Sequence, residues 1–316
     1  MTSELHLHLD GSMRIKTLIE LARHDGIKLS SYEPDELLEQ IKFKQGMTQE
    51  ECLNAFSTTL SVMQTKYAIS RIAYEICEDQ RNKGIDYAEI RYCPFLHQQN
   101  GLRIEEIVSS VHNGLSMGEK DFGIKTAQIF CALRHENEEH SIALADLACY
   151  FSKRYPEYKI AGFDLACAEA NNPPWRHDKA FEIVKNAGLK TTVHAGEVPE
   201  SFYYLRYAIC TMGADRIGHG TLLIKDEMLM ESAKRLGTTI ECCVTSNVHT
   251  GIIKSVEEHP AKKLFDRGVK IAFCADNTLL SQTTAEKEYR IAKKFLGFSD
   301  KELEKVKKYS DEARFR

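Results

Sequence analysis

Eight short runs rich in β-forming residues recur along this 316-residue chain, and each is followed by a segment with apolar residues at helical spacing. The runs are ELHLH, IDYAEIRY, KTAQIFCAL, IAGFDLA, LKTTVH, DRIGH, GTTIECCV and GVKIAFCA. In the first intervening segment, MRIKTLIELARHDG, residues Ile15, Leu18 and Ala22 share one helical face. Gly26 follows where such a helix would end. A strict alternation of strand and helix predicts a parallel sheet.

Eight such units predict a (β/α)₈ barrel of the α/β class, because these barrels have about 250 residues plus insertions. A doubly wound sheet is the competing arrangement. Such a sheet usually carries a GxGxxG turn after its first strand, whereas HLDGSMR follows the first run here. We expect residues 1–316 to form a single catalytic barrel domain, with a helical insertion at about residues 30–80 after the first strand.

Composition and charge exclude several other classes of protein. With 43% hydrophobic and 28% charged residues, the chain can bury a large core. A net charge of −4 made of interspersed acids and bases offers no basic face for nucleic acid. No apolar run approaches the roughly 20 residues that span a bilayer, and the first residues lack the pattern of a secretion signal. We expect no nucleic-acid partner and no membrane association.

The ten cysteines are spread singly along the chain, apart from the adjacent Cys242 and Cys243. No CxxC occurs, and several cysteines stand inside apolar runs, where cysteine behaves as a small buried hydrophobe. This pattern favours free thiols in a reducing compartment, the cytoplasm.

Polar residues gather at the ends of the predicted strands. Active sites of parallel barrels are built at the carboxyl ends of the strands, so this placement supports the barrel and predicts a site there. A doubly wound sheet offers no such ring. The residues are His6, His8 and Asp10 after the first run, His194 and Glu197 after the fifth, His219 at the end of the sixth, and Asp276 and Asn277 after the eighth.

His6 and His8 are two residues apart, so their side chains point to the same face of a strand and can share one cation. The alternative is a pair of half-buried polar residues. A catalytic zinc needs three protein ligands and an open position for water, and His194 and Asp276 would complete such a site. Zinc lowers the pKa of its water toward about 7, so the set predicts hydrolytic chemistry.

Glu197 and His219 are candidates for handling protons beside that metal. Glu197 follows His194 by three residues across an Ala-Gly turn, which allows it to donate or accept a proton without ligating. His219 would face the water from the next strand. Each has an ordinary alternative, a solvated turn for Glu197 and a core histidine for His219, but their joint placement at consecutive strand ends favours function.

The sequence resembles the adenosine deaminase family, zinc-dependent metallo-hydrolases of the adenosine/AMP deaminase type with an amidohydrolase-like barrel, over nearly its whole length. The matching stretches, in order, are ELHLHLDGS, AYEICEDQRNKGIDYAEIRYCP, LRHE, GFDLA, TTVHAGE, DRIGHGTLL, TSNVHTG and CADNTLL. The resemblance implies hydrolytic deamination of adenosine and deoxyadenosine to inosine, deoxyinosine and ammonia in purine salvage. It also implies a small-molecule purine nucleoside as partner. The oligomeric state stays open, and a monomer is compatible with the sequence.

The resemblance also assigns roles to residues. It implies one Zn²⁺ per chain, bound by His6, His8, His194 and Asp276. Glu197 would protonate purine N1 as the water attacks C6, and its pKa is expected to be raised by burial. His219 would orient or deprotonate the water, assisted by Asp276. The remaining contacts implied are the ribose for Asp10, an apolar gate for Phe56, purine N3 for the backbone of Cys167, and purine N7 for Asn277.

Three features depart from the family pattern. Cys167 stands where the family usually has glycine, and a side chain there would narrow the pocket or force φ away from a value that glycine tolerates freely. Asn277 replaces a frequent second aspartate and can donate to N7 without a carboxyl proton. The chain ends at KKYSDEARFR, where relatives usually continue, so we expect less closing packing and lower stability.

Two other functions stay open at this point. One is deamination of another 6-aminopurine or an N6-substituted purine nucleotide. The other is a zinc-binding barrel that has lost its activity. Relatives with two metals usually bridge them with a modified lysine at the end of the fourth strand, whereas Lys159 precedes that strand here. A single metal is therefore expected.

Overall fold

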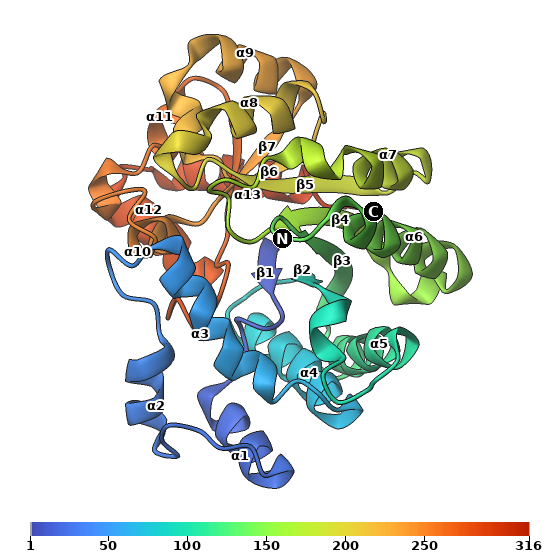
Figure 1. Ribbon diagram of the computed structural model, residues 1–316. Coiled ribbons are helices and arrows are strands. Elements are labelled where there is room, and N and C mark those ends of the chain that lie inside the picture. Colours follow the sequence, from blue (N-terminus) through green and yellow to red (C-terminus); the bar gives the residue numbers. More distant parts are fainter. Residues whose placement is uncertain (1, 316) are drawn as a thin grey trace.

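The computed structural model describes residues 2–315, and within them eight parallel strands form one sheet in the order in which they occur in the chain. Each predicted run overlaps one strand, so the prediction of a (β/α)₈ barrel is confirmed (Figure 1). The strands are β1 (Ser3–His8), β2 (Tyr87–Tyr92), β3 (Lys125–Leu133), β4 (Ile160–Ala166), β5 (Lys190–Ala195), β6 (Arg216–His219), β7 (Thr239–Cys242) and β8 (Lys270–Phe273).

The last strand meets the first just beyond the end of β8. The Asp276 N–H donates to the His6 carbonyl at 2.9 Å, and the His8 N–H donates to the Asp276 carbonyl at 2.9 Å. These two bonds close the ring of strands. They also bring residues from opposite ends of the chain to one point, where the predicted metal ligands lie.

Helices surround the strands (Figure 1). Helix α1 ends at Asp25, and Gly26 follows it as the cap, in the left-handed conformation. The α-helices are α1 (Ile15–Asp25), α2 (Pro34–Ile41), α3 (Gln49–Ser61), α4 (Lys66–Asn82), α5 (Ile104–Phe122), α6 (Glu138–Arg154), α7 (Asp178–Asn186), α8 (Phe202–Cys210), α9 (Glu227–Leu236), α10 (Val244–His249), α11 (Ala261–Asp266), α12 (Ala285–Phe295) and α13 (Asp300–Glu312). Short 3₁₀ turns are η1 (Pro94–His97), η2 (Pro156–Tyr158), η3 (Pro174–His177), η4 (Pro199–Ser201), η5 (Thr221–Lys225) and η6 (Val256–Glu258). No helix among the described residues has the length and apolar character needed to cross a bilayer.

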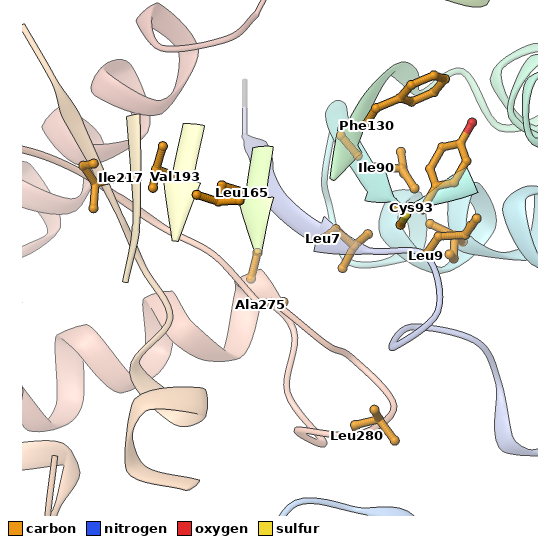
Figure 2. Packing of buried hydrophobic residues seen from close by; sticks show 14 of the residues in the cluster. Leu7, Leu9, Ile90, Cys93, Phe130, Leu165, Val193, Ile217, Ala275 and Leu280 are labelled. Atoms are coloured by element: carbon orange, nitrogen blue, oxygen red, sulfur yellow. The ribbon is translucent and has the colours of Figure 1, made fainter. Parts of the chain in front are cut away.

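Successive side chains of each strand point to opposite faces of the sheet, so one face contributes to the apolar core and the other carries the site residues. Figure 2 shows Leu165, Val193 and Ile217 on neighbouring strands, and all three are fully buried in the large apolar core. Val193 and Ile217 face one another across the β5/β6 pair. Because successive side chains point to opposite faces, His194 points to the other side of the sheet, into the barrel.

Helix α3 begins with a capping box that fixes its start. The Thr48 side chain accepts the Glu51 N–H at 3.2 Å, and the Glu51 carboxylate accepts the Thr48 N–H at 2.8 Å. Gln49 is therefore held in the first turn of α3, the helix whose residues reach the pocket described below.

The end of the chain packs under the barrel. Helix α13 lies against β8 and β1, and the Arg216 guanidinium stacks 3.5 Å from the centre of the buried Phe315 ring. The Phe315 N–H also donates to Glu89 at 2.7 Å. The described end of the chain is therefore packed against the barrel, and the lower stability expected relative to longer relatives stays a prediction.

Candidate active site

A pocket of about 240 Å³ opens at the carboxyl ends of the strands. It contains most of the residues singled out from the sequence, together with apolar residues from α3 and from the loops after β2 and β4. The described lining is His8, Asp10, Phe43, Gln49, Cys52, Leu53, Phe56, Leu60, Tyr92, Cys93, Leu96, Cys131, Leu133, His135, Ala166, Cys167, His194, Glu197, His219, Ser246, Thr250, Asp276 and Asn277.

The four predicted metal ligands lie together, and three of them, His8, His194 and Asp276, line this pocket, whereas His6 is fully buried. His6, His8, His194 and Asp276 each offer a ligand atom within 4.8 Å of the others. Nε2 of His6 and of His8 lie 3.5 and 3.4 Å from Asp276 Oδ1. A second grouping with the same spacing consists of His6, His219, Cys243 and Asp276.

Carboxylates behind two of the imidazoles set their tautomers. His6 Nδ1 donates to Glu241 Oε2 at 2.6 Å, and His194 Nδ1 donates to Asp164 Oδ1 at 3.1 Å. Each Nε2 is then left with its lone pair directed at the other ligands, and the buried His6 Nε2 has no hydrogen-bond partner within the described part of the chain. Imidazoles oriented in this way are prepared for a cation.

A buried guanidinium joins the two carboxylates. Arg91 contacts Asp164 at 2.9 Å and Glu241 at 3.0 Å, with no side chain of the three exposed. Burial alone would raise the pKa of Glu241, but the positive charges of Arg91 and Arg216 lower it by a larger amount. The resulting pKa lies well below the usual range of a glutamate. Both carboxylates therefore stay charged and keep accepting from the histidines.

Glu197 is buried on a turn that another carboxylate holds in place. Glu169 accepts the N–H groups of Gly196 at 2.9 Å, Glu197 at 2.8 Å and Val198 at 3.3 Å. Gly196 has φ +80°, a conformation that side chains rarely adopt. The Glu197 side chain lies in the pocket, where burial raises its pKa to about 8, as the sequence predicted in direction.

His219 lies beside the Glu197 carboxyl. Its Nε2 is 3.2 Å from Glu197 Oε1, and its side chain is almost completely buried. The backbone of His219 has φ +65°, which is uncommon outside glycine. Such a conformation is a strain that the surrounding fold must offset, and it is typical of functional positions.

The predicted substrate contacts Asp10 and Asn277 also lie in the pocket. Oδ1 of each is buried and has no hydrogen-bond partner among residues 2–315. Burial raises the pKa of Asp10 to about 7. Gly11 allows the close approach of Asn277, because a Cβ at Gly11 would lie 1.8 Å from Asn277 Oδ1.

Helix α3 brings Phe56 and Gln49 to the pocket. The Phe56 ring lies 6.5 Å from the His8 ring and 6.1 Å from the Phe43 ring, in keeping with an apolar cover. Gln49 was not predicted from the sequence. Its Oε1 accepts the Glu169 N–H at 2.8 Å, and its Nε2 donates to Glu197 Oε2 at 3.2 Å.

Cys167 follows β4 and lines the pocket with its backbone at φ +76°. The sequence predicted that a side chain in place of glycine would narrow the pocket or force φ away from a value that glycine tolerates freely, whereas the φ of +76° is one that glycine adopts freely, so the backbone keeps a glycine-like conformation. The residue is partly buried, and desolvation raises the pKa of its thiol well above the ordinary value. The ten cysteines all lie within the described residues and are free, as expected.

Replacement of Cys167 should separate backbone strain from side-chain volume. We expect Cys167→Val to destabilise the protein by about 2 kcal/mol, because a β-branched residue is poorly compatible with this φ and such strain costs about 1–3 kcal/mol. Cys167→Gly should stay within about 1 kcal/mol of the parent. Urea unfolding midpoints measure both, and equal midpoints for valine and glycine would contradict the strained backbone.

Several residues that support the site gave little signal in the sequence. Glu241 was detectable in principle, as a lone acid within the apolar run TTIECCV. Asp164 belongs to the matching stretch GFDLA, but its partner was not apparent. His259 is buried, and its Nε2 lies 3.1 Å from Asn247 Oδ1.

Comparison with known proteins gives consistent matches over the whole chain. The family model "Adenosine deaminase" matches residues 2–315. An adenosine deaminase of Clostridium kluyveri is 35% identical over 99% of this chain and 89% of its own length. A probable adenosine deaminase of Dictyostelium discoideum is 37% identical over 98% of this chain, which spans only 39% of that longer protein.

Solved structures agree on the fold. An adenine deaminase of Arthrobacter aurescens superimposes with a TM-score of 0.91 at 26% identity, covering 100% of this chain and 94% of its own. An Arabidopsis protein in complex with GMP gives 0.86 at 25%, covering 100% and 92%. A Burkholderia amidohydrolase with bound Zn gives 0.88 at 22%, covering 100% and 85%, and supports the fold alone. On the family match and the sequence identity together, the chain belongs to the adenosine deaminase family.

Proposed function

We propose that this protein is a zinc-dependent hydrolase that converts adenosine and deoxyadenosine to inosine, deoxyinosine and ammonia in cytoplasmic purine salvage. Residues 1–316 act as one catalytic domain in this proposal, and a monomer suffices. The observation that carries it is the buried Glu197 carboxyl beside a cluster of three imidazoles and one carboxylate in a single pocket. The relatives named adenosine deaminase support the same reaction.

The residues at the pocket floor fit a zinc ion. Three imidazoles and one carboxylate are typical zinc ligands, and His6 and His194 are already held with Nε2 lone pairs toward the common centre. We assign one zinc to His6, His8, His194 and Asp276. Bound there, zinc would act as a Lewis acid and lower the pKa of a water molecule to about 7.

Glu197 is the proposed proton donor. An aromatic C6 resists attack by water, and protonation of purine N1 withdraws electrons from that carbon. Because burial raises the pKa of Glu197 to about 8, the carboxyl is protonated at neutral pH and can give its proton to N1. Glu169 holds the turn that carries it, and His219 orients the attacking water from the opposite side.

The other lining residues would hold the nucleoside. The unpartnered Oδ1 of Asp10 is available to accept from a ribose hydroxyl, and the Asn277 amide can donate to N7. The backbone at Cys167 faces N3 in this arrangement, and Phe56 covers the ring as part of the apolar gate.

The lining favours a nucleoside over a nucleotide. Among the described residues that line the pocket there is no lysine or arginine to pair with a phosphate, and Asp10 would repel one. The Arabidopsis neighbours in complex with GMP and IMP are nucleotide-binding proteins of the same fold. The second candidate is another 6-aminopurine, which the likeness to an adenine deaminase favours.

An absorbance assay of purine loss tests the proposal. Zinc-loaded enzyme would be offered adenosine, deoxyadenosine, adenine, AMP and N6-methyl-AMP, each with and without a chelator. Chelator-sensitive loss of adenosine with little loss of AMP supports the proposal. Preference for adenine or for N6-methyl-AMP would move the assignment to the second candidate, and no turnover of any of them would indicate a barrel without this activity.

The pH profile should carry the signature of Glu197. Its protonated form is the active one, present below a pKa of about 8 and lost above it, so kcat/KM for adenosine should fall about tenfold per pH unit on the alkaline side. Steady-state kinetics from pH 6 to 10 measure this limb. The limb should vanish from the residual activity of Glu197→Gln, and a flat parent profile up to pH 10 would contradict the assignment.

A further inference from the structure

A chain of hydrogen bonds runs from the start of α11 to His219. Two of its members, Asn247 and His259, have no role in the function proposed above. The Ala261 N–H donates to His259 Nδ1 at 3.2 Å, and His259 Nε2 lies 3.1 Å from Asn247 Oδ1. Asn247 Nδ2 in turn lies 2.9 Å from His219 Nδ1. Asn247 and His259 are buried, and neither lines the pocket within the described part of the chain.

The direction of every bond in this chain follows from its first member. A backbone N–H can only donate, so His259 Nδ1 must accept and carries no proton. Burial lowers the pKa of His259 to about 3, so the ring is neutral and its proton is on Nε2. That N–H donates to Asn247 Oδ1, which places the amide Nδ2 toward His219. His219 Nδ1 must then accept, and the proton of a neutral His219 is on Nε2.

We infer that Asn247 and His259 are positioning residues that fix His219 as the Nε2–H tautomer, so that His219 donates a hydrogen bond into the pocket and does not take the proton of the attacking water. The second half of this inference rests on the proposed function. It decides between the two roles, orienting or deprotonating the water, that the sequence left open for His219.

Both ring nitrogens of His219 are committed in this arrangement. The Nδ1 lone pair receives the Asn247 amide, and Nε2–H faces Glu197 Oε1 at 3.2 Å. A general base needs a free lone pair directed at the proton that it removes, and His219 has none toward the pocket. Asp276, which lines the pocket on that side, is the remaining candidate.

The same tautomer distinguishes the two possible groups of metal ligands. Ligation by an imidazole requires a lone pair, which His6 and His194 present from Nε2 because their Nδ1 atoms donate to carboxylates. His219 is held in the opposite tautomer, with its proton on Nε2 and its lone pair on Nδ1. The group containing His219 and Cys243 is therefore excluded as a metal site, and the group containing His8 and His194 is retained.

Nitrogen NMR of histidine-labelled protein tests the tautomer directly, without any assay of turnover. In long-range ¹H–¹⁵N spectra of the zinc-loaded and the metal-free protein, the unprotonated, pyridine-like nitrogen of His219 should be Nδ1. Loss of its signals in a His219→Gln variant identifies them. A pyridine-like Nε2, or a doubly protonated ring, would overturn the inference.

Two substitutions at Asn247 test the consequence. Asn247→Asp has nearly the same shape but accepts from both neighbours, so it should move the His219 proton to Nδ1 and lower kcat by about 10–100-fold, with KM within about threefold. Asn247→Ala removes the donor and should lower kcat less. Asn113→Asp, on the exposed face of α5, is the matched control and should change neither the spectra nor kcat.

The outcomes separate this inference from the proposed function. If the parent fails to deaminate adenosine but its spectra show Nε2–H, the proposed function fails and the positioning role stands. If the parent is active and Asn247→Asp shifts the tautomer with no loss of kcat, the donor role of His219 is wrong. Should Asn247→Asp fail to fold, judged by its melting curve, the parent spectra and the Asn247→Ala kinetics decide.

Discussion

Glu197→Gln is expected to lower kcat for adenosine by about 10²–10⁴-fold, the contribution of one general acid. Glutamine keeps the size of the side chain and can still face His219 and Gln49, but it has no proton to give to N1. KM should change only a few-fold, because the loss is confined to the transition state. Steady-state kinetics with matched zinc content measure this effect.

Glu136→Gln provides the control for that experiment. Glu136 follows β3 with a side chain that is 40% exposed, and it is outside the described lining of the pocket. The same change of acid to amide there should leave kcat and KM unaltered. Near-normal turnover by zinc-loaded Glu197→Gln would rule out Glu197 as the proton donor.

Removal of one ligand, by His194→Ala, should abolish stoichiometric zinc binding and lower kcat/KM by more than about 100-fold. Mutation of a residue that only hydrogen-bonds to a metal ligand typically lowers metal affinity or activity by about 10–100-fold, and His194 is itself a proposed ligand. The variant should also lose the rise in melting temperature that zinc gives the parent, since an ion that binds only the folded state stabilises it. Elemental analysis, calorimetry and the adenosine assay together measure these losses.

His112→Ala is the matched control for the metal prediction. His112 stacks on Tyr158 at 4.3 Å and belongs to the outer helix α5, away from the pocket lining. It should bind zinc and deaminate adenosine as the parent does. Full activity of His194→Ala after exhaustive chelation would refute the metal-dependent mechanism.

The sequence was sufficient for features that depend on local pattern. Each of the eight predicted runs overlaps one strand, and only Ser3 of β1 and Ala195 of β5 extend beyond the runs, because alternation and strand length depend on a few consecutive residues. His8, His194, Glu197 and Asp276 converge because the barrel places every strand end on one rim. Their roles in catalysis stay predictions, which the variants above test.

Features that depend on long-range packing were not predictable in this way. The bond from His6 to Glu241 joins residues 235 positions apart. Gln49 contacts Glu197 from α3, and no local sequence pattern predicts where this helix lies relative to the barrel. Asn247 belongs to the matching stretch TSNVHTG, but its bond to His259 and the direction of that bond, which is set at a backbone N–H, could not be predicted from the sequence. The packing of Phe315 under the barrel likewise required knowledge of its partners, Arg216 and Glu89.

The junction of the first and last strands determines when, during synthesis of the chain, the proposed metal ligands can come together. Asp276, which closes the ring by bonding to the backbone of both His6 and His8, is made about 270 residues after them. At typical translation rates of 5–20 residues per second this delay is about 15–50 s. The proposed set of four metal ligands is therefore complete only after the segment that follows the eighth strand has been made.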